Sequence, residues 1–169
     1  FVIGILSLVF YPFVMILIKL DDGGSVFYVQ ERIGRNNRVI KLKKFRSMSE
    51  EGTNKVTRVG KWLRKFRIDE LPQLWNVLKG EMSMIGPRPE IPSLVRHYES
   101  EIPYYNVRHL IKPGLSGWAQ LYHEDPPKVT ADSDKTRRKL SYDLYYIKNR
   151  SLMLDLKIAL KTLKTLLSK

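Results

Sequence analysis

The first eighteen residues are almost entirely apolar. They read FVIGILSLVFYPFVMILI and are followed by Lys19. A straight helix of this length would measure about 27 Å at 1.5 Å per residue, against a hydrocarbon core of about 30 Å. Pro12 removes a helical hydrogen bond inside the stretch, so a kink or a break is expected there. The stretch therefore predicts a membrane segment with a kink or a break at Pro12.

Two membrane arrangements are compatible with this segment. A straight span would place the basic remainder of the chain on the cytoplasmic side by the positive-inside rule. A helix broken at Pro12 would enter one leaflet and return, with the hydroxyls of Ser7 and Tyr11 available to backbone groups freed at the break. The chain does not begin with Met, which fits a catalytic domain cut from a longer protein with extra transmembrane helices; the sequence does not decide whether Phe1 is such a truncation point.

The charge of the chain indicates an anionic partner. Its 169 residues carry a formal net charge of +13 and include no cysteine. Residues 21–70 hold 13 basic and 7 acidic residues, and residues 135–169 hold 10 and 2. Such an excess favours nucleic acid, an anionic membrane surface or phosphorylated substrates. The absence of cysteine excludes a disulfide framework, a thiolate zinc site and a cysteine nucleophile.

The remainder of the chain predicts an α+β domain that is mainly helical, with a small β-hairpin. Residues 25–30 and 38–45 are rich in β-branched and aromatic residues and flank a turn at 34–37, as in a hairpin. Pro72 is well placed to begin a helix that stops at Gly80. Further along, 113–128 is expected to be a structured loop, and 135–149 and 152–167 are expected to be helices.

Two segments, 55–67 and 152–167, predict basic amphipathic helices. In the first, Trp62 and Phe66 fall on the apolar side, and lysines and arginines fill the rest. In the second, leucines line one side and lysines the other. Helices of this composition lie in the interface of a bilayer. An ordinary surface helix docked on a core explains the first segment equally well.

Asp69 and Glu70 are adjacent carboxylates in a strongly cationic chain. Since they precede the helix expected at Pro72, one explanation is that they complement its dipole. The other explanation is chemical, because carboxylates ligate Mg²⁺ and an aspartate can attack phosphorus to form an aspartyl phosphate. Nearby arginines could then hold phosphate oxygens. Neither a P-loop nor a dinucleotide-binding glycine motif occurs.

The order of five segments resembles that of the bacterial sugar transferases, the monotopic polyprenol-phosphate phosphoglycosyl transferases. Each segment is weak alone, but five in this order and spacing are highly specific. They are the proline-interrupted N-terminal stretch, GSVFYVQERIGRNNRVIKLKKFRSM, RKFRIDELPQLWNVLKGEMSMIGPRPE, IKPGLSGWAQL and YDLYYIKNRSLMLDLKIALKTL.

This resemblance implies transfer of a sugar 1-phosphate from a UDP-sugar to polyprenol (undecaprenyl) phosphate, with release of UMP. Such a step begins the assembly of O-antigen, capsule or exopolysaccharide at the membrane. The resemblance also implies a re-entrant helix over residues 1–20, broken at Pro12, and a catalytic domain over 21–169 that faces the cytoplasm at the bacterial inner membrane.

The same resemblance implies a role for each candidate residue. Asp69 would be the nucleophile and would bind Mg²⁺, and a phosphosugar-aspartyl intermediate would form on it. Glu70 would assist through the metal, by positioning or by proton transfer. Phosphate-binding positions match Lys44, Arg64 and Arg88, and a further acidic position of the active site matches Asp143.

One segment departs from the family pattern. Many relatives continue after SGWAQL with an Asn-Gly-Arg-like sequence, whereas residues 122–127 read YHEDPP. The donor sugar therefore cannot be inferred from the resemblance. A non-catalytic membrane adaptor stays an alternative, as does a nucleic-acid-binding module, although no nucleic-acid-binding pattern is evident and residues 1–18 would be unexplained. We expect no nucleic-acid partner, and a homodimer is compatible with the sequence.

Overall fold

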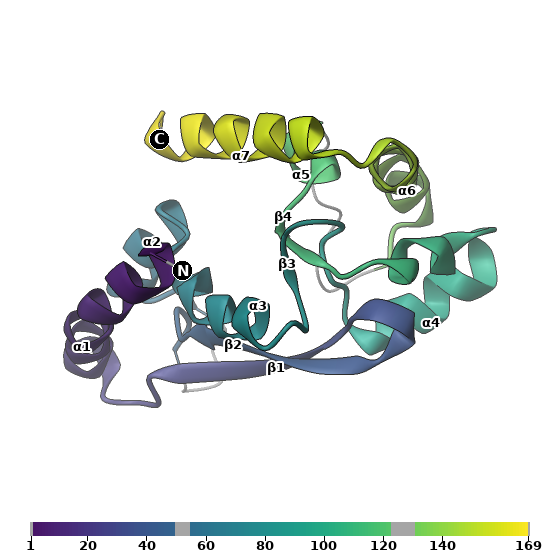
Figure 1. The fold of residues 1–169 in the computed structure, drawn as a ribbon. Helices are drawn as coiled ribbons and strands as arrows, with labels where there is room; N and C mark the ends of the chain where they lie inside the picture. Colours follow the sequence, from purple (N-terminus) through teal and green to yellow (C-terminus); the bar gives the residue numbers. More distant parts are fainter. Residues whose placement is uncertain (1, 50–54, 123–130, 169) are drawn as a thin grey trace. The chain divides into compact units, whose positions relative to one another are not determined.

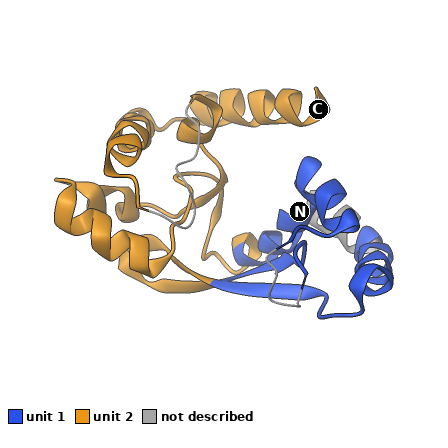
Figure 2. Cartoon of the chain, turned by 180° about the vertical axis from the view of Figure 1, so that it is seen from behind, with its two compact units in different colours: residues 1–30, 42–76, 169 blue, residues 31–41, 77–168 orange. Residues whose placement is uncertain are grey.

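The computed structural model describes residues 2–49, 55–122 and 131–168. These residues form a mainly helical α+β structure with two small sheets of two strands each (Figure 1). The chain divides into two compact units (Figure 2). Unit 1 contains Phe1–Gln30 and Leu42–Asn76, and unit 2 contains Glu31–Lys41 and Val77–Ser168. Each unit has its own hydrophobic core.

Unit 1 begins with helix α1, which runs over Val2–Asp22 and contains Pro12. The break expected at Pro12 is not found, because the helix continues through the proline. A proline removes only its own backbone donor, so the hydrogen bonds on either side can carry the helix past it. Within the described residues, none of the helices has both the length and the apolar composition needed to cross a membrane.

The predicted β-hairpin is confirmed. Its strands are β1 (Phe27–Ile33) and β2 (Val39–Phe45), which pair with each other. The turn between them is a short 3-10 helix, η1, over Arg35–Asn37. Asn36 and Asn37 have φ angles of 55° and 58° there, a left-handed conformation that asparagine tolerates better than most residues.

Helix α2 (Arg58–Lys65) follows the hairpin in unit 1. Its side-chain cap is Thr57, whose hydroxyl accepts a hydrogen bond of 2.9 Å from Gly60 N. The helix is shorter than the predicted 55–67, since Val56 instead pairs with Met48 in an isolated β-bridge. A Cβ on Gly60 would lie 2.1 Å from the carbonyl oxygen of Ser47. Only glycine therefore lets α2 approach this backbone so closely.

One side of α1 is buried in the core of unit 1. It is formed by Val14, Ile18, Phe45 and Leu63. The two α1 residues are one helical turn apart, as expected for a face that packs on a core. Other apolar residues of the same helix stay exposed, with exposed fractions of 58 to 79%: Phe10, Phe13, Ile16 and Leu20. Helix α1 thus presents apolar side chains both to the core and to its surroundings.

Unit 2 is built around a short parallel sheet and several helices. Strand β3 (Ser83–Ile85) pairs with β4 (Gly114–Ser116). The helices are α4 (Pro92–Glu101), the 3-10 helix η3 (Tyr105–Leu110), α5 (Trp118–Tyr122), α6 (Ser133–Asn149) and α7 (Leu152–Leu167). The last two were predicted, whereas α4, η3 and the sheet were not. The loop expected at 113–128 contains β4 and α5, and its residues 123–128, with most of the YHEDPP segment, lie outside the described residues.

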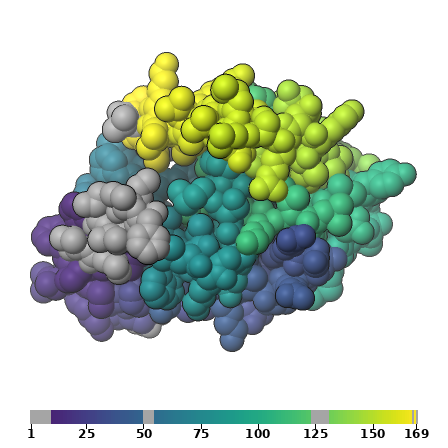
Figure 3. Space-filling model, in the orientation of Figure 1, coloured from purple at the N-terminus to yellow at the C-terminus, as the bar shows by residue number. Residues whose placement is uncertain are grey.

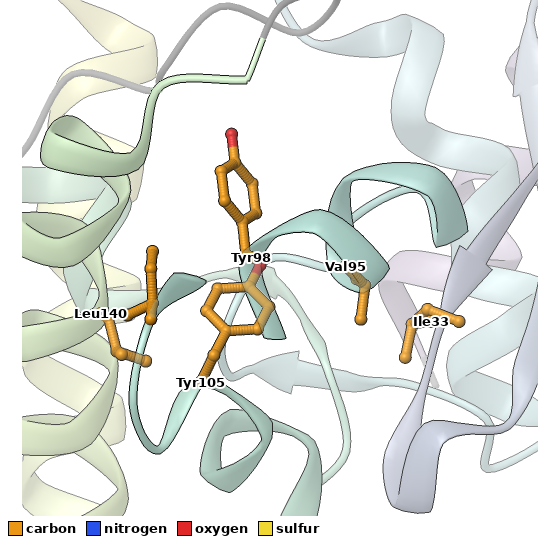
Figure 4. Packing of buried hydrophobic residues seen from close by; sticks show 6 residues of the cluster. Ile33, Val95, Tyr98, Tyr105 and Leu140 are labelled. Atoms are coloured by element: carbon orange, nitrogen blue, oxygen red, sulfur yellow. The ribbon is translucent and has the colours of Figure 1, made fainter. Parts of the chain in front are cut away.

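Two features hold unit 2 together. Figure 4 shows its core, in which tyrosines of α4 and η3 pack beside aliphatic side chains; the cluster is Ile33, Val95, Tyr98, Ile102, Tyr105 and Leu140. The sheet depends on glycine. A Cβ on Gly114 would lie 2.1 Å from the nitrogen of Gly86, and one on Gly117 would lie 2.3 Å from the Gly86 oxygen. The two backbones could not meet so closely with larger residues.

Helix α7 carries an exposed apolar stripe. Figure 3 shows this helix, in yellow, on the surface of the protein. Ile158 is fully buried, so the side of α7 that contains it packs on the rest of unit 2. The leucines predicted to form one apolar side lie mostly in the open, and the exposed residues are Leu152, Met153, Leu156, Leu160 and Leu163. The predicted helix is confirmed, but most of its apolar residues do not enter the core.

Candidate active site

The adjacent carboxylates lie in the first turn of a 3-10 helix, η2 (Ile68–Gln73), which leads into α3 (Leu74–Leu78). The residue before η2, Arg67, has a left-handed φ of 54°, and its carbonyl accepts a hydrogen bond of 3.2 Å from Glu70 N. We expected a helix to begin at Pro72. It begins four residues earlier, at Ile68, so Pro72 lies inside η2 rather than at the start of the helix.

Both carboxylate oxygens of Glu70 face cations. Lys44 Nζ donates a hydrogen bond of 2.9 Å to Glu70 Oε1. Arg67 Nη1 lies 3.5 Å from Glu70 Oε2. The side chains of Lys44 and Glu70 are 16% and 12% exposed, so this ion pair is largely withdrawn from water. Glu70 is therefore held by Lys44 of strand β2 and by Arg67, the residue before η2.

The Asp69 carboxylate has different surroundings. It is half-buried, and among the described residues it takes part in no hydrogen bond or ion pair. Burial raises its pKa above the ordinary value, and the neighbouring charge of Glu70 raises it further. Lys44, Arg64 and Arg67 act in the opposite direction. A partly desolvated carboxylate with open oxygens and cations nearby is suited to attack an electrophile or to bind a metal ion.

Arg64 approaches this group from α2. Its Nε donates a hydrogen bond of 2.8 Å to Ser47 Oγ. This contact orients the guanidinium, and its charge lowers the Asp69 pKa. Four predicted site residues thus belong to one group in unit 1: Lys44, Arg64, Asp69 and Glu70. We call them, together with Arg67, the carboxylate cluster.

The carboxylate cluster could bind Mg²⁺ through a single carboxylate that shares the ion with a substrate phosphate. Mg²⁺ is commonly bound by one or two carboxylates together with substrate phosphates and water, rather than by a cage of protein ligands. The described residues contain no group of three or more histidines, aspartates and glutamates that could form such a cage. Glu70 already faces two cations, so Asp69 is the carboxylate that could share a metal ion with a bound phosphate.

The other two predicted site residues belong to unit 2. Arg88 is partly exposed between Pro87 and Pro89, which are buried. Asp143 is only 2% exposed on α6, and its Oδ2 lies 2.9 Å from Arg108 Nη2. Burial raises the pKa of Asp143, against the effect of Arg108. Asp143 is therefore engaged with a buried arginine, and the same guanidinium nitrogen reaches the Arg88 carbonyl at 2.8 Å.

The charged residues that surround Asp143 were not predicted from the sequence. Arg108 is 3% exposed, and Lys139 Nζ donates a hydrogen bond of 2.5 Å to Glu90 Oε1. Burial acts to raise the Glu90 pKa, but Lys139 and Arg108 bring it below the ordinary value. Lys139 and Asp143 stand four residues apart in a predicted helix, so they share one helix face. That spacing could have linked Lys139 to Asp143 from the sequence, whereas no sequence pattern pointed to Arg108.

Comparison with known proteins identifies a family with this sequence pattern. Residues 1–169 match the family profile described as bacterial sugar transferase. The chain is 49% identical over 164 residues to a UDP-N-acetylgalactosamine-undecaprenyl-phosphate N-acetylgalactosaminephosphotransferase of Aeromonas hydrophila, covering 90% of this chain and 38% of the relative. It is 41% identical over 168 residues to an undecaprenyl-phosphate glucose phosphotransferase of Komagataeibacter xylinus, covering 89% and 31%.

A third relative is similar in length. The chain is 39% identical over 168 residues to the exopolysaccharide production protein PSS of Rhizobium leguminosarum bv. phaseoli, covering 90% of this chain and 83% of the relative. By contrast, the chain spans about a third of the length of the first two relatives.

Proposed function

Because this chain belongs to the bacterial sugar transferase family, we propose that it transfers a sugar 1-phosphate from a UDP-linked sugar to undecaprenyl phosphate and releases UMP. The names of two relatives contain undecaprenyl phosphate as the acceptor, and one of them contains a UDP-linked sugar. The observation that carries the proposal is the Asp69 carboxylate, which has no partner of its own among the described residues but lies close to three cations.

In the first step, an Asp69 carboxylate oxygen attacks the phosphorus that bears the sugar. A bond forms between this oxygen and phosphorus, the phosphoanhydride bond of the donor breaks, and UMP leaves with its electron pair. The carboxylate must be ionised to attack. Lys44, Arg64 and Arg67 favour this form, against burial and Glu70, which disfavour it.

In the second step, a phosphate oxygen of undecaprenyl phosphate attacks the same phosphorus. The bond to Asp69 breaks, the carboxylate is restored, and the product is a lipid diphosphate sugar. Two successive displacements mean that the soluble donor and the lipid acceptor need not be bound at the same time.

The cations of the site reduce the repulsion between a carboxylate and phosphate oxygens. Arg64 is suited to this task, because a guanidinium contacts phosphate oxygens with two parallel hydrogen bonds. We propose the same role for Arg88 of unit 2. Asp69 would hold Mg²⁺, which would neutralise phosphate charge when bound. Glu70 would keep Lys44 beside the nucleophile, since these two side chains form an ion pair at 2.9 Å.

We further propose that the protein works on the cytoplasmic side of the bacterial inner membrane. Exposed apolar residues on α1 and α7 support a contact with lipid; examples are Phe10, Phe13, Leu156 and Leu160. Lysines on α7 would add electrostatic attraction to anionic headgroups, about 1 kcal/mol for each well-placed residue. A donor-loaded enzyme at this surface would meet its lipid substrate by two-dimensional diffusion.

Trapping the intermediate tests the proposed function. Purified protein is incubated with Mg²⁺ and a UDP-sugar labelled in the sugar, without lipid acceptor; UDP-N-acetylgalactosamine and UDP-glucose are compared. The denatured protein should retain label in the wild type and in the control Asp134→Asn, which alters an exposed aspartate on α6. Asp69→Asn should retain none. Label on Asp69→Asn would remove Asp69 from the role of nucleophile.

The labelling result, together with further assays, separates the alternatives. If no UDP-sugar labels the wild type, and Asp69→Asn supports membrane association and function in cells as well as the wild type does, a non-catalytic adaptor explains the protein better. Salt-sensitive binding of oligonucleotides would instead favour a nucleic-acid-binding module.

A further inference from the structure

The segment that carries Arg88 is held by its carbonyl groups. Four consecutive carbonyl oxygens, those of residues 87–90, each accept a hydrogen bond from another part of unit 2. The donors are Gly114 N to Pro87 at 2.9 Å, Arg108 Nη2 to Arg88 at 2.8 Å, Arg32 Nη1 to Pro89 at 3.1 Å and Ile33 N to Glu90 at 2.8 Å.

This arrangement follows from the sequence of the segment. Pro87 and Pro89 have no N–H groups and fix their own φ angles, so the segment is stiff and cannot pair as a regular strand. Its partly buried carbonyls still need donors, because an unpaired carbonyl that is withdrawn from water is unfavourable. Two of the four donors are side chains, and the one that reaches Arg88 itself comes from Arg108.

Arg108 is rigidly placed. Its Nη1 donates a hydrogen bond of 2.6 Å to Tyr105 Oη, and its guanidinium carbon lies 5.1 Å from the centre of that ring. Its Nη2 lies 2.9 Å from Asp143 Oδ2. Since a guanidinium is planar and its donors keep fixed directions, holding one nitrogen orients the other. Asp143 also balances the charge of an arginine that is 3% exposed.

We infer that Arg108 is a positioning residue: held by Tyr105 and Asp143, it fixes the Arg88 carbonyl and so aims the Arg88 side chain at the diphosphate of the UDP-sugar donor. The inference rests on the proposed function, in which Arg88 contacts that diphosphate. It assigns Asp143 to the support of Arg108, which agrees with the burial of its carboxylate and with its distance of 2.9 Å from Arg108.

The test is a cycle of variants at positions 108 and 88. Arg108→Lys keeps the charge but loses the planar pair of donors, so it should raise the KM for the UDP-sugar about tenfold, as expected when one charge-assisted hydrogen bond is lost. In an Arg88→Lys background, the same change should have little further effect, because residues that act as a unit are not additive. Arg96→Lys, on the exposed side of α4, is the matched control and should leave the KM unchanged.

Circular dichroism and thermal unfolding show whether each variant is folded. If Arg108→Lys does not fold, Tyr105→Phe replaces it; this change removes one acceptor of Arg108 and should raise the KM about threefold, again only when Arg88 is present. An unchanged KM in folded Arg108→Lys would overturn the inference. An equal rise with and without Arg88→Lys would also overturn it, since a purely structural role predicts that result.

The outcomes for the two proposals can be told apart. If the wild type is labelled by a UDP-sugar at Asp69 but the KM is insensitive to Arg108, the inference fails and the proposed function stands. If no UDP-sugar labels or binds the wild type, the proposed function fails, and the inference is overturned with it.

Discussion

Replacing Lys44 with methionine should destabilise the protein and change the pH dependence of its activity. The ammonium group donates a hydrogen bond to Glu70 at 2.9 Å, and both side chains are less than one-fifth exposed. Removing one member of a buried ion pair costs about 3–5 kcal/mol, because the other charge is left without compensation. Exposed pairs contribute about 1 kcal/mol or less.

For Lys44→Met we expect a loss between these limits. Arg67 Nη1, at 3.5 Å, still faces the other oxygen of Glu70, so the carboxylate is not left entirely alone. A loss of about 2 kcal/mol is expected, which corresponds to a fall in the melting temperature of roughly 4–8 °C for a chain of this size. The neighbouring Lys43→Met is the matched control, because Lys43 Nζ is exposed and lies 4.9 Å from the centre of the Phe27 ring. It should cost less than about 1 kcal/mol.

Activity should respond through Asp69. Lys44 is one of the charges that lower the Asp69 pKa, so its removal raises that pKa further. The acid limb of the pH–rate profile should therefore move to higher pH in Lys44→Met and stay in place in Lys43→Met.

A double-mutant cycle with Glu70→Gln checks the reasoning. Urea unfolding of the wild type, the two single variants and the double variant gives the coupling energy between the two residues. The double variant removes both largely buried charges, and the Arg67 charge that remains is 43% exposed. The double variant should therefore be more stable than the sum of the single losses predicts. Strictly additive losses, together with an acid limb that does not move, would refute both the ion pair and its effect on Asp69.

Two further predictions concern elements outside the carboxylate cluster. Serine in place of Leu156 and Leu160 on the exposed stripe of α7 should reduce sedimentation with vesicles containing anionic lipid without lowering the melting temperature, whereas equal binding would exclude α7 from the lipid contact. Gly114→Ala should destabilise unit 2 by at least about 3 kcal/mol, because its Cβ would lie 2.1 Å from the Gly86 nitrogen. The control is Gly23→Ala, whose Cβ would have no atom within 4 Å. This change should cost only about 1 kcal/mol, because Gly23 has a positive φ. Chemical denaturation measures both, and equal losses would contradict the close approach.

Local patterns in the sequence predicted local structure. Helix α7 has the bounds expected from its leucine spacing, because its cap, Ser151, accepts a hydrogen bond from Leu154 N at 3.2 Å within the same segment. The hairpin likewise needs only neighbouring residues. Strands β3 and β4 could not be predicted, since each has three residues and their pairing depends on glycines about thirty positions apart. The covered side of α7 is also a tertiary property, and no periodicity in its own residues could show which apolar side chains stay exposed.

The candidate site, like the fold, could be predicted from the sequence only in part. Adjacent carboxylates and the order of motifs pointed to Asp69, Glu70 and Arg88 directly. The ion pair between Lys44 and Glu70 joins residues 26 positions apart, and it distinguishes two carboxylates that look equivalent in the sequence. Arg108 gave no signal, because a lone arginine near an apolar motif is usually a surface residue. Its importance depends on the carbonyl and the carboxylate that the fold brings beside it.

The difference between Asp69 and Glu70 has a physical consequence for the proposed chemistry. Successive residues of a 3-10 helix point about 120° apart, so a cation bound to Glu70 does not have to occupy the oxygens of Asp69. Lys44 and Arg67 are fixed by Glu70, yet their charges still lower the Asp69 pKa. An ion pair made directly to Asp69 would favour the ionised form more strongly, but it would also cover the oxygen that has to reach phosphorus. In the proposed chemistry, cations held by the neighbouring carboxylate would offset part of the rise in the Asp69 pKa that burial and Glu70 cause, without covering the oxygen that attacks. This would give each of the two adjacent acids a separate task.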